Sequence, residues 1–110
     1  MFAVTEDKIK QTIQSLIQTY KPLYIYSFGS YAQNNLDKNS DFDVLVVVDE
    51  YDDARWKVTA RGYAGFWDIN MPIDLIVYDK AWFESSKNND KTFCYSIIKK
   101  GRLMYARDNT

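Results

Sequence analysis

The sequence predicts an α/β (α+β) fold in which a mixed sheet of about four strands is flanked by helices. Short apolar runs rich in β-branched and aromatic residues predict the strands, and apolar residues at helical spacing predict the helices. The two kinds of segment alternate along the chain. Its length of 110 residues suits one domain, so we expect residues 1–110 to form a single unit with its own core.

The first part of the chain predicts a helix, a strand and a tight turn. Apolar residues at helical spacing predict an amphipathic helix over Thr5–Tyr20, which starts with acidic residues and ends before Pro22. Leu23–Phe28 has the composition of a strand. Gly29 and Ser30 follow it directly, and we expect them to turn the chain into a short helical segment.

The middle of the chain predicts a polar loop, a buried strand and another helix. Asn34–Ser40 is polar, and Phe42–Val48 is a nearly continuous apolar run, which predicts a strand covered on both faces. We expect the acidic residues at positions 49–53 to cap and solvate the start of the next helix. One face of that helix is expected to carry Trp56, Ala60, Tyr63, Ala64 and Trp67.

The last part of the chain predicts a third strand, two short helices and a final strand. Ile73–Tyr78 has a strand pattern, and helical patterns occur around Ala81–Ser85 and over Lys91–Lys100. We expect Gly101 to cap the last helix and Leu103–Tyr105 to add a short strand.

Composition excludes several classes of protein. No run of about 20 apolar residues is present, so we expect no membrane span, no membrane partner and a cytoplasmic location. A net charge of −1 provides no basic field for a nucleic acid, which we do not expect as a partner. The chain has no histidine and one cysteine, so a metal would need oxygen ligands. Its 3 Trp, 9 Tyr and 6 Phe are many for this size and suggest an interface with a partner.

A motif with chemical meaning joins the Gly-Ser turn to the second strand. Ten residues separate Ser30 from Asp41, and Asp41 and Asp43 stand at the start of the apolar run. Side chains two apart on a strand share a face, so these carboxylates should lie together. Like charges repel unless a cation lies between them, and magnesium takes carboxylates together with substrate phosphates. Gly29 would let backbone N–H groups approach a phosphate, to which Ser30 could donate its hydroxyl.

Asp74 is a third candidate ligand. It lies within the apolar strand Ile73–Tyr78, where an unpaired charge would cost several kcal/mol. If this strand pairs beside Phe42–Val48, Asp74 joins Asp41 and Asp43 at one site. Each also has a purely structural interpretation: Asp41 as a turn cap, Asp43 as a solvated strand end, and Asp74 as the buried partner of a basic residue.

A calcium-binding loop is the competing metal motif. Asp37, Asn39 and Asp41 match the first three ligand positions of an EF-hand loop. Phe42 stands where that loop needs glycine and Val48 where it needs glutamate, so we do not expect a calcium site.

Taken together, the sequence resembles the minimal nucleotidyltransferases of the DNA polymerase β superfamily. The resemblance lies in Phe28–Ala32, the ten-residue gap, Ser40–Val46, Ile73–Val77 and the segments 95–98 and 101–105. It implies a nucleotidyltransferase fold similar to the polymerase β palm, ATP as substrate and two Mg²⁺ ions. The metal ligands implied are Asp41, Asp43 and Asp74.

The resemblance also implies a reaction in which a nucleoside monophosphate is transferred and pyrophosphate leaves. Gly29 and Ser30 would hold the β- and γ-phosphates. Asp41 and Asp43 would bridge both metal ions. Asp74 would bind one ion and help to take the proton from the incoming hydroxyl.

One departure concerns the phosphates. Many relatives continue the motif with Arg-Gly, where this chain has Gln33-Asn34, so a guanidinium that could hold phosphate is missing. Lys38, Arg55 or Arg61 could replace it.

Small members of this group are similar to the antitoxin half of two-gene modules whose partner is an all-helical HEPN ribonuclease toxin. The resemblance implies that this chain moves AMP from ATP to a tyrosine of such a toxin and silences it. Two alternatives stay open. One is a non-catalytic antitoxin that acts by binding, which the Gln33-Asn34 departure favours, and the other is nucleotidylation of a small molecule.

Overall fold

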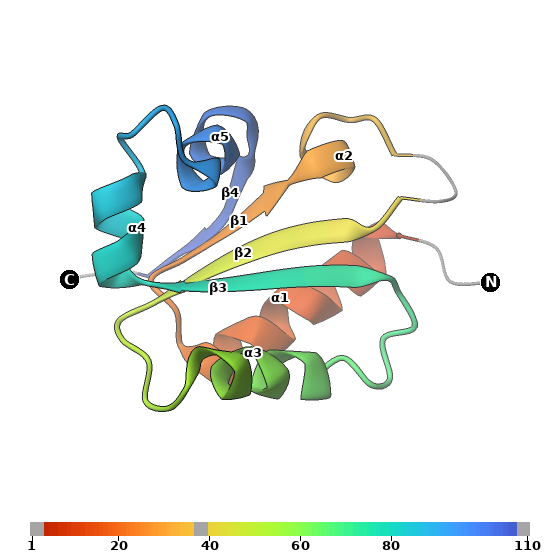
Figure 1. The fold of residues 1–110 in the computed structure, drawn as a ribbon. Helices are drawn as coiled ribbons and strands as arrows, with labels where there is room; N and C mark the ends of the chain where they lie inside the picture. Colours follow the sequence, from red (N-terminus) through yellow and green to blue (C-terminus); the bar gives the residue numbers. More distant parts are fainter. Residues whose placement is uncertain (1–3, 37–39, 108–110) are drawn as a thin grey trace.

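The computed structural model describes residues 4–36 and 40–107 and shows a sheet with helices on both faces (Figure 1). The elements in chain order are α1 (Glu6–Tyr20), β1 (Tyr24–Phe28), α2 (Gly29–Ala32), β2 (Phe42–Val48), α3 (Arg55–Ala64), β3 (Ile73–Asp79), α4 (Lys80–Ser86), α5 (Phe93–Lys100) and β4 (Arg102–Ala106). Within the described residues the strands form one four-stranded sheet in the order β3-β2-β1-β4. β1 is antiparallel to β2 and β4, whereas β2 and β3 are parallel. The predicted mixed sheet is therefore confirmed.

The helices divide the core into two layers. α1 and α3 cover one face of the sheet, and α4 and α5 cover the other (Figure 1). Because side chains alternate along a strand, Val44 and Val46 of β2 enter the first layer and Leu45 and Val47 enter the second. Every residue of β2 except Asp43 is buried, which confirms the prediction of a strand covered on both faces.

The first two elements lie within one residue of their predicted bounds. α1 begins at Glu6 because Thr5 is its N-cap, and the Thr5 hydroxyl accepts a hydrogen bond from the Lys8 N–H at 3.3 Å. Its last residue is Tyr20, and its C-cap is Lys21, whose φ of 46° is left-handed. β1 begins at Tyr24, and α2 follows it directly as expected. Of the predicted loop 34–40, residues 37–39 lie outside the described residues.

α3 packs on the sheet through a face that the aromatic pattern did not predict. Trp56 is 70% exposed, and the buried residues of the helix are Val58 and Gly62. A Cβ at Gly62 would lie 2.4 Å from the Tyr20 hydroxyl oxygen and 2.5 Å from Leu75 Cδ2. The absence of a side chain at Gly62 therefore lets the helix approach α1 and β3, and this close approach determines which face is buried.

Three of the four acidic residues before α3 form ion pairs, and their side chains do not cap the helix: Asp49, Asp52 and Asp53. The N-cap is Ala54, which has no side-chain capping bond. Asp52 pairs with Arg61, and Asp53 lies 4.0 Å from Lys57 and accepts a hydrogen bond from the Ala54 N–H. The predicted capping is therefore wrong, although these acidic side chains are exposed as expected.

α5 is fixed at both ends against the sheet. It begins after Thr92, whose hydroxyl accepts a backbone N–H at 3.2 Å, and it ends at Gly101 as predicted. A Cβ on Gly101 would lie 2.4 Å from the carbonyl oxygens of both Ile97 and Ser27. The end of α5 thus rests directly on β1, next to the turn into α2. None of the described helices is long and apolar enough to cross a membrane.

Candidate active site

Two of the predicted carboxylates lie side by side on neighbouring strands. Asp43 is the second residue of β2, and Asp74 is the second residue of β3. The parallel register pairs these two residues directly, with their strands about 4.8 Å apart. On its other side Asp43 pairs with Phe28, the last residue of β1. The condition on which Asp74 joins the site, that its strand pairs beside Phe42–Val48, is therefore met.

The surroundings of Asp43 disfavour a free negative charge. Burial, and then the nearby charges of Asp74 and Asp41, raise the pKa of Asp43 to about 6. A carboxyl group in this position is stabilised either by a proton or by a cation.

Asp74 reaches this site without being buried. We predicted that an unpaired charge in its apolar strand would be costly, but Asp74 is exposed. The reason is that β3 stands at one end of the strand order and Asp74 lies near the start of the strand. The prediction that Asp74 is buried is therefore wrong, and the place of Asp74 at the site depends on strand register. Asp41 is also exposed and immediately precedes β2.

Gly29 lies against Asp43 at the turn between β1 and α2. Its φ of 70° falls in the left-handed region that favours glycine. A Cβ on Gly29 would lie 2.2 Å from Asp43 Oδ2, so there is no room for a side chain. The backbone of the turn thus comes directly to the carboxylate. Ser30, which is half-buried, follows as the second residue of α2.

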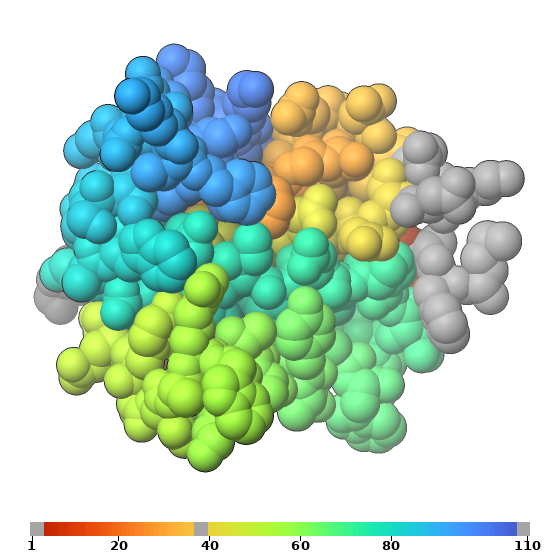
Figure 2. Space-filling model, in the orientation of Figure 1, coloured from red at the N-terminus to blue at the C-terminus, as the bar shows by residue number. Residues whose placement is uncertain are grey.

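A cavity of about 310 Å³ lies between this turn and α5. The wall formed by the turn and the strand ends contains Phe28, Gly29, Gln33 and Asp43. The opposite wall is one face of α5, with residues at positions i, i+3, i+4 and i+7: Phe93, Ser96, Ile97 and Lys100. In Figure 2 the surface of α2 (orange) adjoins that of the α5 region (blue).

The α5 wall is the part of the site that sequence reasoning missed. The helix itself was predicted, and the spacing of its residues would have identified a shared face. Only the tertiary structure places this face opposite Gly29. Conversely, Ser30, Asp41 and Asp74, which we predicted as site residues, do not line the cavity.

The oxygen donors at the site suit magnesium without forming a complete metal centre. In the parts of the chain that the structure describes, no three Asp, Glu, His or Cys side chains gather closely enough to hold a metal ion. Asp43 and its acidic neighbours nevertheless offer the carboxylate oxygens that Mg²⁺ prefers. Magnesium commonly takes one or two carboxylates and completes its shell with water and substrate phosphates. The residues present therefore fit a metal that binds together with a phosphate group.

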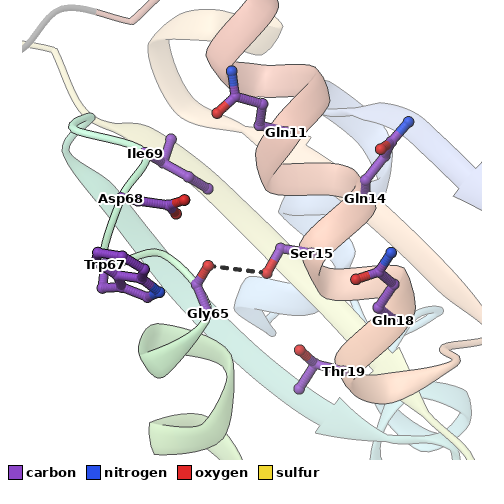
Figure 3. Close-up of a pocket in the computed structure, with 9 residues that line it drawn as sticks. All are labelled: Gln11, Gln14, Ser15, Gln18, Thr19, Gly65, Trp67, Asp68 and Ile69. Carbon is purple, nitrogen blue, oxygen red and sulfur yellow. Dashed lines mark hydrogen bonds between the residues drawn. The ribbon is translucent and has the colours of Figure 1, made fainter.

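A larger cavity, of about 470 Å³, lies between α1 and the segment after α3 (Figure 3). At its edge Ser15 donates its hydroxyl to the Gly65 carbonyl at 3.2 Å. Its described lining residues include three glutamines and Asp68, but no lysine or arginine. Because charge-assisted contacts are the strong ones for a polyphosphate, this cavity is not the candidate nucleotide site.

A comparison with protein families finds one that spans nearly the whole chain. The family model described as polymerase beta, nucleotidyltransferase matches residues 10–110. No curated protein sequence matches the chain.

Solved structures share the fold. A protein of Sulfolobus solfataricus described as a nucleotidyltransferase has a TM-score of 0.61 and 21% identity, over 94% of this chain and 81% of its own. A chain from a toxin-antitoxin structure with AMP-PNP has a TM-score of 0.62 and 25% identity, over 96% and 76%. A chain from the complex of a tri-AMPylated Shewanella oneidensis HEPN toxin with its MNT antitoxin has a TM-score of 0.57 and 18% identity, over 93% and 72%.

Proposed function

The chain belongs to the polymerase β nucleotidyltransferase family, and from this premise we propose that it transfers AMP from ATP to a protein hydroxyl group. The acceptor that we propose is a tyrosine of a partner HEPN toxin, which the chain neutralises as its antitoxin. One observation carries the chemical part of the proposal. Asp43 stands in register with Asp74 and directly against Gly29, so that carboxylates and the glycine turn meet at one point.

The turn is proposed to hold the β- and γ-phosphates of the nucleotide. Gly29 has a φ of 70°, and a glycine in such a turn lets backbone N–H groups approach a phosphate oxygen. Ser30 follows at the start of α2 and can donate its hydroxyl. The cavity beside the turn, which Gly29 also lines, would give these phosphates space.

Asp41, Asp43 and Asp74 are proposed to hold magnesium, with two ions expected. When bound, magnesium supplies positive charge that offsets the negative charge on the leaving pyrophosphate. Burial and the neighbouring carboxyl groups disfavour the ionised form of Asp43. A bound cation would stabilise that form.

The reaction is a substitution at the α-phosphorus of ATP. The acceptor oxygen bonds to this phosphorus, the bond from the phosphorus to the oxygen that bridges to the β-phosphate breaks, and pyrophosphate leaves with the electron pair. Asp74 is proposed to take the proton of the acceptor hydroxyl on a carboxylate oxygen. Its exposure would allow a hydroxyl group of another protein to reach it.

The surface of the chain supports a protein as the acceptor. Trp56 and Trp67 are 70% and 83% exposed, and exposed large aromatic residues are enriched at interfaces. Two similar solved structures come from toxin-antitoxin complexes, one with AMP-PNP and one with a tri-AMPylated HEPN toxin. These resemblances motivate the choice of partner.

Intact mass spectrometry tests this function. The protein encoded next to this chain is incubated with the chain, ATP and magnesium, and its mass is measured. We expect a gain of one or more AMP units, and we expect no gain with the variant Asp41→Asn/Asp43→Asn. A partner whose mass stays unchanged with the wild-type chain, while still forming a complex, would contradict the transfer reaction.

A non-catalytic antitoxin is the second candidate function, favoured by Gln33 at the cavity wall, where many relatives have arginine. In that case the Asp41→Asn/Asp43→Asn variant would neutralise the partner as well as the wild-type chain does. If the partner is neither modified nor bound, transfer to a small hydroxylated molecule becomes the candidate to test.

A further inference from the structure

The candidate nucleotide cavity contains one cationic side chain. Of the described residues that line it, only Lys100 carries a positive charge. A nucleoside triphosphate brings several negative charges to a cavity whose wall already carries the carboxyl group of Asp43. A cation on the cavity wall is therefore the feature that phosphate binding requires.

The other basic residues that the sequence suggested are committed elsewhere. The Arg55 guanidinium lies 4.7 Å from the centre of the Trp82 ring and donates to the Val77 carbonyl. Arg61 pairs with Asp52. Lys38, which could also replace the missing guanidinium, lies outside the described residues.

The basic neighbours of Lys100 also have partners. Lys99 donates to the Tyr95 hydroxyl at 3.2 Å and lies over the same ring. Arg102 donates to the Ala32 carbonyl at 3.1 Å and also bonds the Asn34 side chain. Among the described residues, by contrast, Lys100 has no carboxylate within ion-pair distance, and its side chain is exposed.

The contacts of Arg102 place Lys100 relative to the turn. Arg102, at the start of β4, donates hydrogen bonds to Ala32 and Asn34, the two neighbours of Gln33 in the chain. These bonds hold the segment around Gln33 against the start of β4. Lys100 lies two residues before Arg102, at the end of α5. Gln33 and Lys100 both line the same cavity, one on each wall.

We propose that Lys100 holds the β- and γ-phosphates of the bound nucleotide from the α5 wall, opposite the turn at Gly29. This inference rests on the proposed function, because it assigns a further residue of the same site. Lysine suits the task as a compact charge on a flexible stem that reaches toward a phosphate. Arg102 acts as a positioning residue that holds the two walls together. In this chain the positive charge is therefore supplied from α5, and Gln33 opposite it is uncharged.

Nucleotide affinity tests this assignment. The dissociation constants of ATP, with magnesium, and of AMP are measured by calorimetry for the wild-type chain and for Lys100→Ala. We expect Lys100→Ala to weaken ATP binding by about 10-fold or more, since a charged hydrogen bond is lost. AMP lacks the β- and γ-phosphates, so its affinity should stay the same. Lys99→Ala, which removes a neighbouring charge that faces Tyr95, is the matched control and should leave both affinities unchanged.

A second variant tests where the charge is needed. Gln33→Arg, introduced into Lys100→Ala, returns a cation to the opposite wall of the cavity and should restore most of the ATP affinity. Unchanged ATP affinity in Lys100→Ala, or an equal loss for ATP and AMP, would overturn the role of Lys100 and leave the transfer reaction standing. A wild-type chain that binds no ATP would instead overturn the proposed function, and the role of Lys100 with it.

Discussion

Gly29 and Asp43 approach so closely that a Cβ on Gly29 would lie 2.2 Å from Asp43 Oδ2. The contact joins two segments of the motif that are separated by a loop in the sequence. Because the turn and the carboxylate touch, a shift in one displaces the other. The proposed phosphate site and the proposed cation site therefore act as one unit.

We predict that Gly29→Ala reduces both stability and AMP transfer. The substitution places a side chain at a φ of 70° and against the Asp43 carboxylate, which should cost about 1–3 kcal/mol in the free energy of unfolding. Thermal or urea unfolding, together with the mass assay, measures both effects. Gln33→Ala, which lines the same cavity without a left-handed backbone, is the control for stability. A Gly29→Ala protein with wild-type stability would show that the turn adapts.

The stability of the chain should depend on the ionisation of Asp43. Its pKa in the folded state is raised to about 6 from 3.8, so the folded state holds this proton more tightly than the unfolded state does. The resulting stabilisation is full below about pH 4 and is lost as the pH rises through 6. Asp43→Asn, which carries no charge at any pH, should therefore exceed the wild-type chain in stability at pH 8 by more than it does at pH 4.

This comparison is made by thermal unfolding in the presence of a chelator and without nucleotide. If the difference in melting temperature between the wild-type chain and Asp43→Asn stayed the same from pH 4 to pH 8, the predicted effect of Asp43 would be contradicted.

Asp74→Asn should separate function from stability. Asp74 is exposed, so the substitution should change the free energy of unfolding by no more than about 0.5 kcal/mol. The proposed roles of Asp74 in metal binding and proton transfer predict a loss of most AMP transfer. Asp68 is an exposed carboxylate at the cavity between α1 and the segment after α3, so Asp68→Asn is the control and should keep full activity. If Asp74→Asn kept its activity, the proposed role of Asp74 in the active site would be contradicted.

Magnesium and ATP should stabilise the chain strongly when both are present and only weakly when either is present alone. Within the described residues no three-ligand metal group is present, so phosphate oxygens are expected to complete the metal shell. Melting temperatures with magnesium, with ATP and with both should therefore show a rise much larger than the sum of the separate effects. A large rise with magnesium alone would contradict this expectation.

Gly62→Ala should destabilise the chain although alanine is the better helix former. Its Cβ would meet the Tyr20 hydroxyl, which donates to the Val58 carbonyl at 2.6 Å and cannot move freely. We expect a loss of about 1–3 kcal/mol by overpacking. Ala60→Gly, on the exposed side of α3, measures the intrinsic preference for alanine, about 1 kcal/mol. A more stable Gly62→Ala protein would show that α3 can move away from α1.

The aromatic residues of α3 show where prediction from pattern ends. They recur at helical spacing, yet Trp56 is exposed and the helix packs through Val58 and Gly62. Helical spacing identifies residues that share a face, but which face is buried depends on the partner surface. Here that surface, formed by Tyr20 and Leu75, is complementary to a glycine.

Prediction from the sequence succeeds for the order of the elements, for the buried strand Phe42–Val48 and for the spacing of the Gly-Ser turn to the acidic pair. The reason is that strand and helix periods and glycine conformations act locally. Two features of the site follow from the three-dimensional fold: Asp74 stands beside Asp43 while exposed to solvent, and Lys100 lines the same cavity as the turn. These relationships depend on strand order and on the docking of α5, which join residues far apart in the chain. Local physics therefore predicts the motif, and long-range packing completes the site.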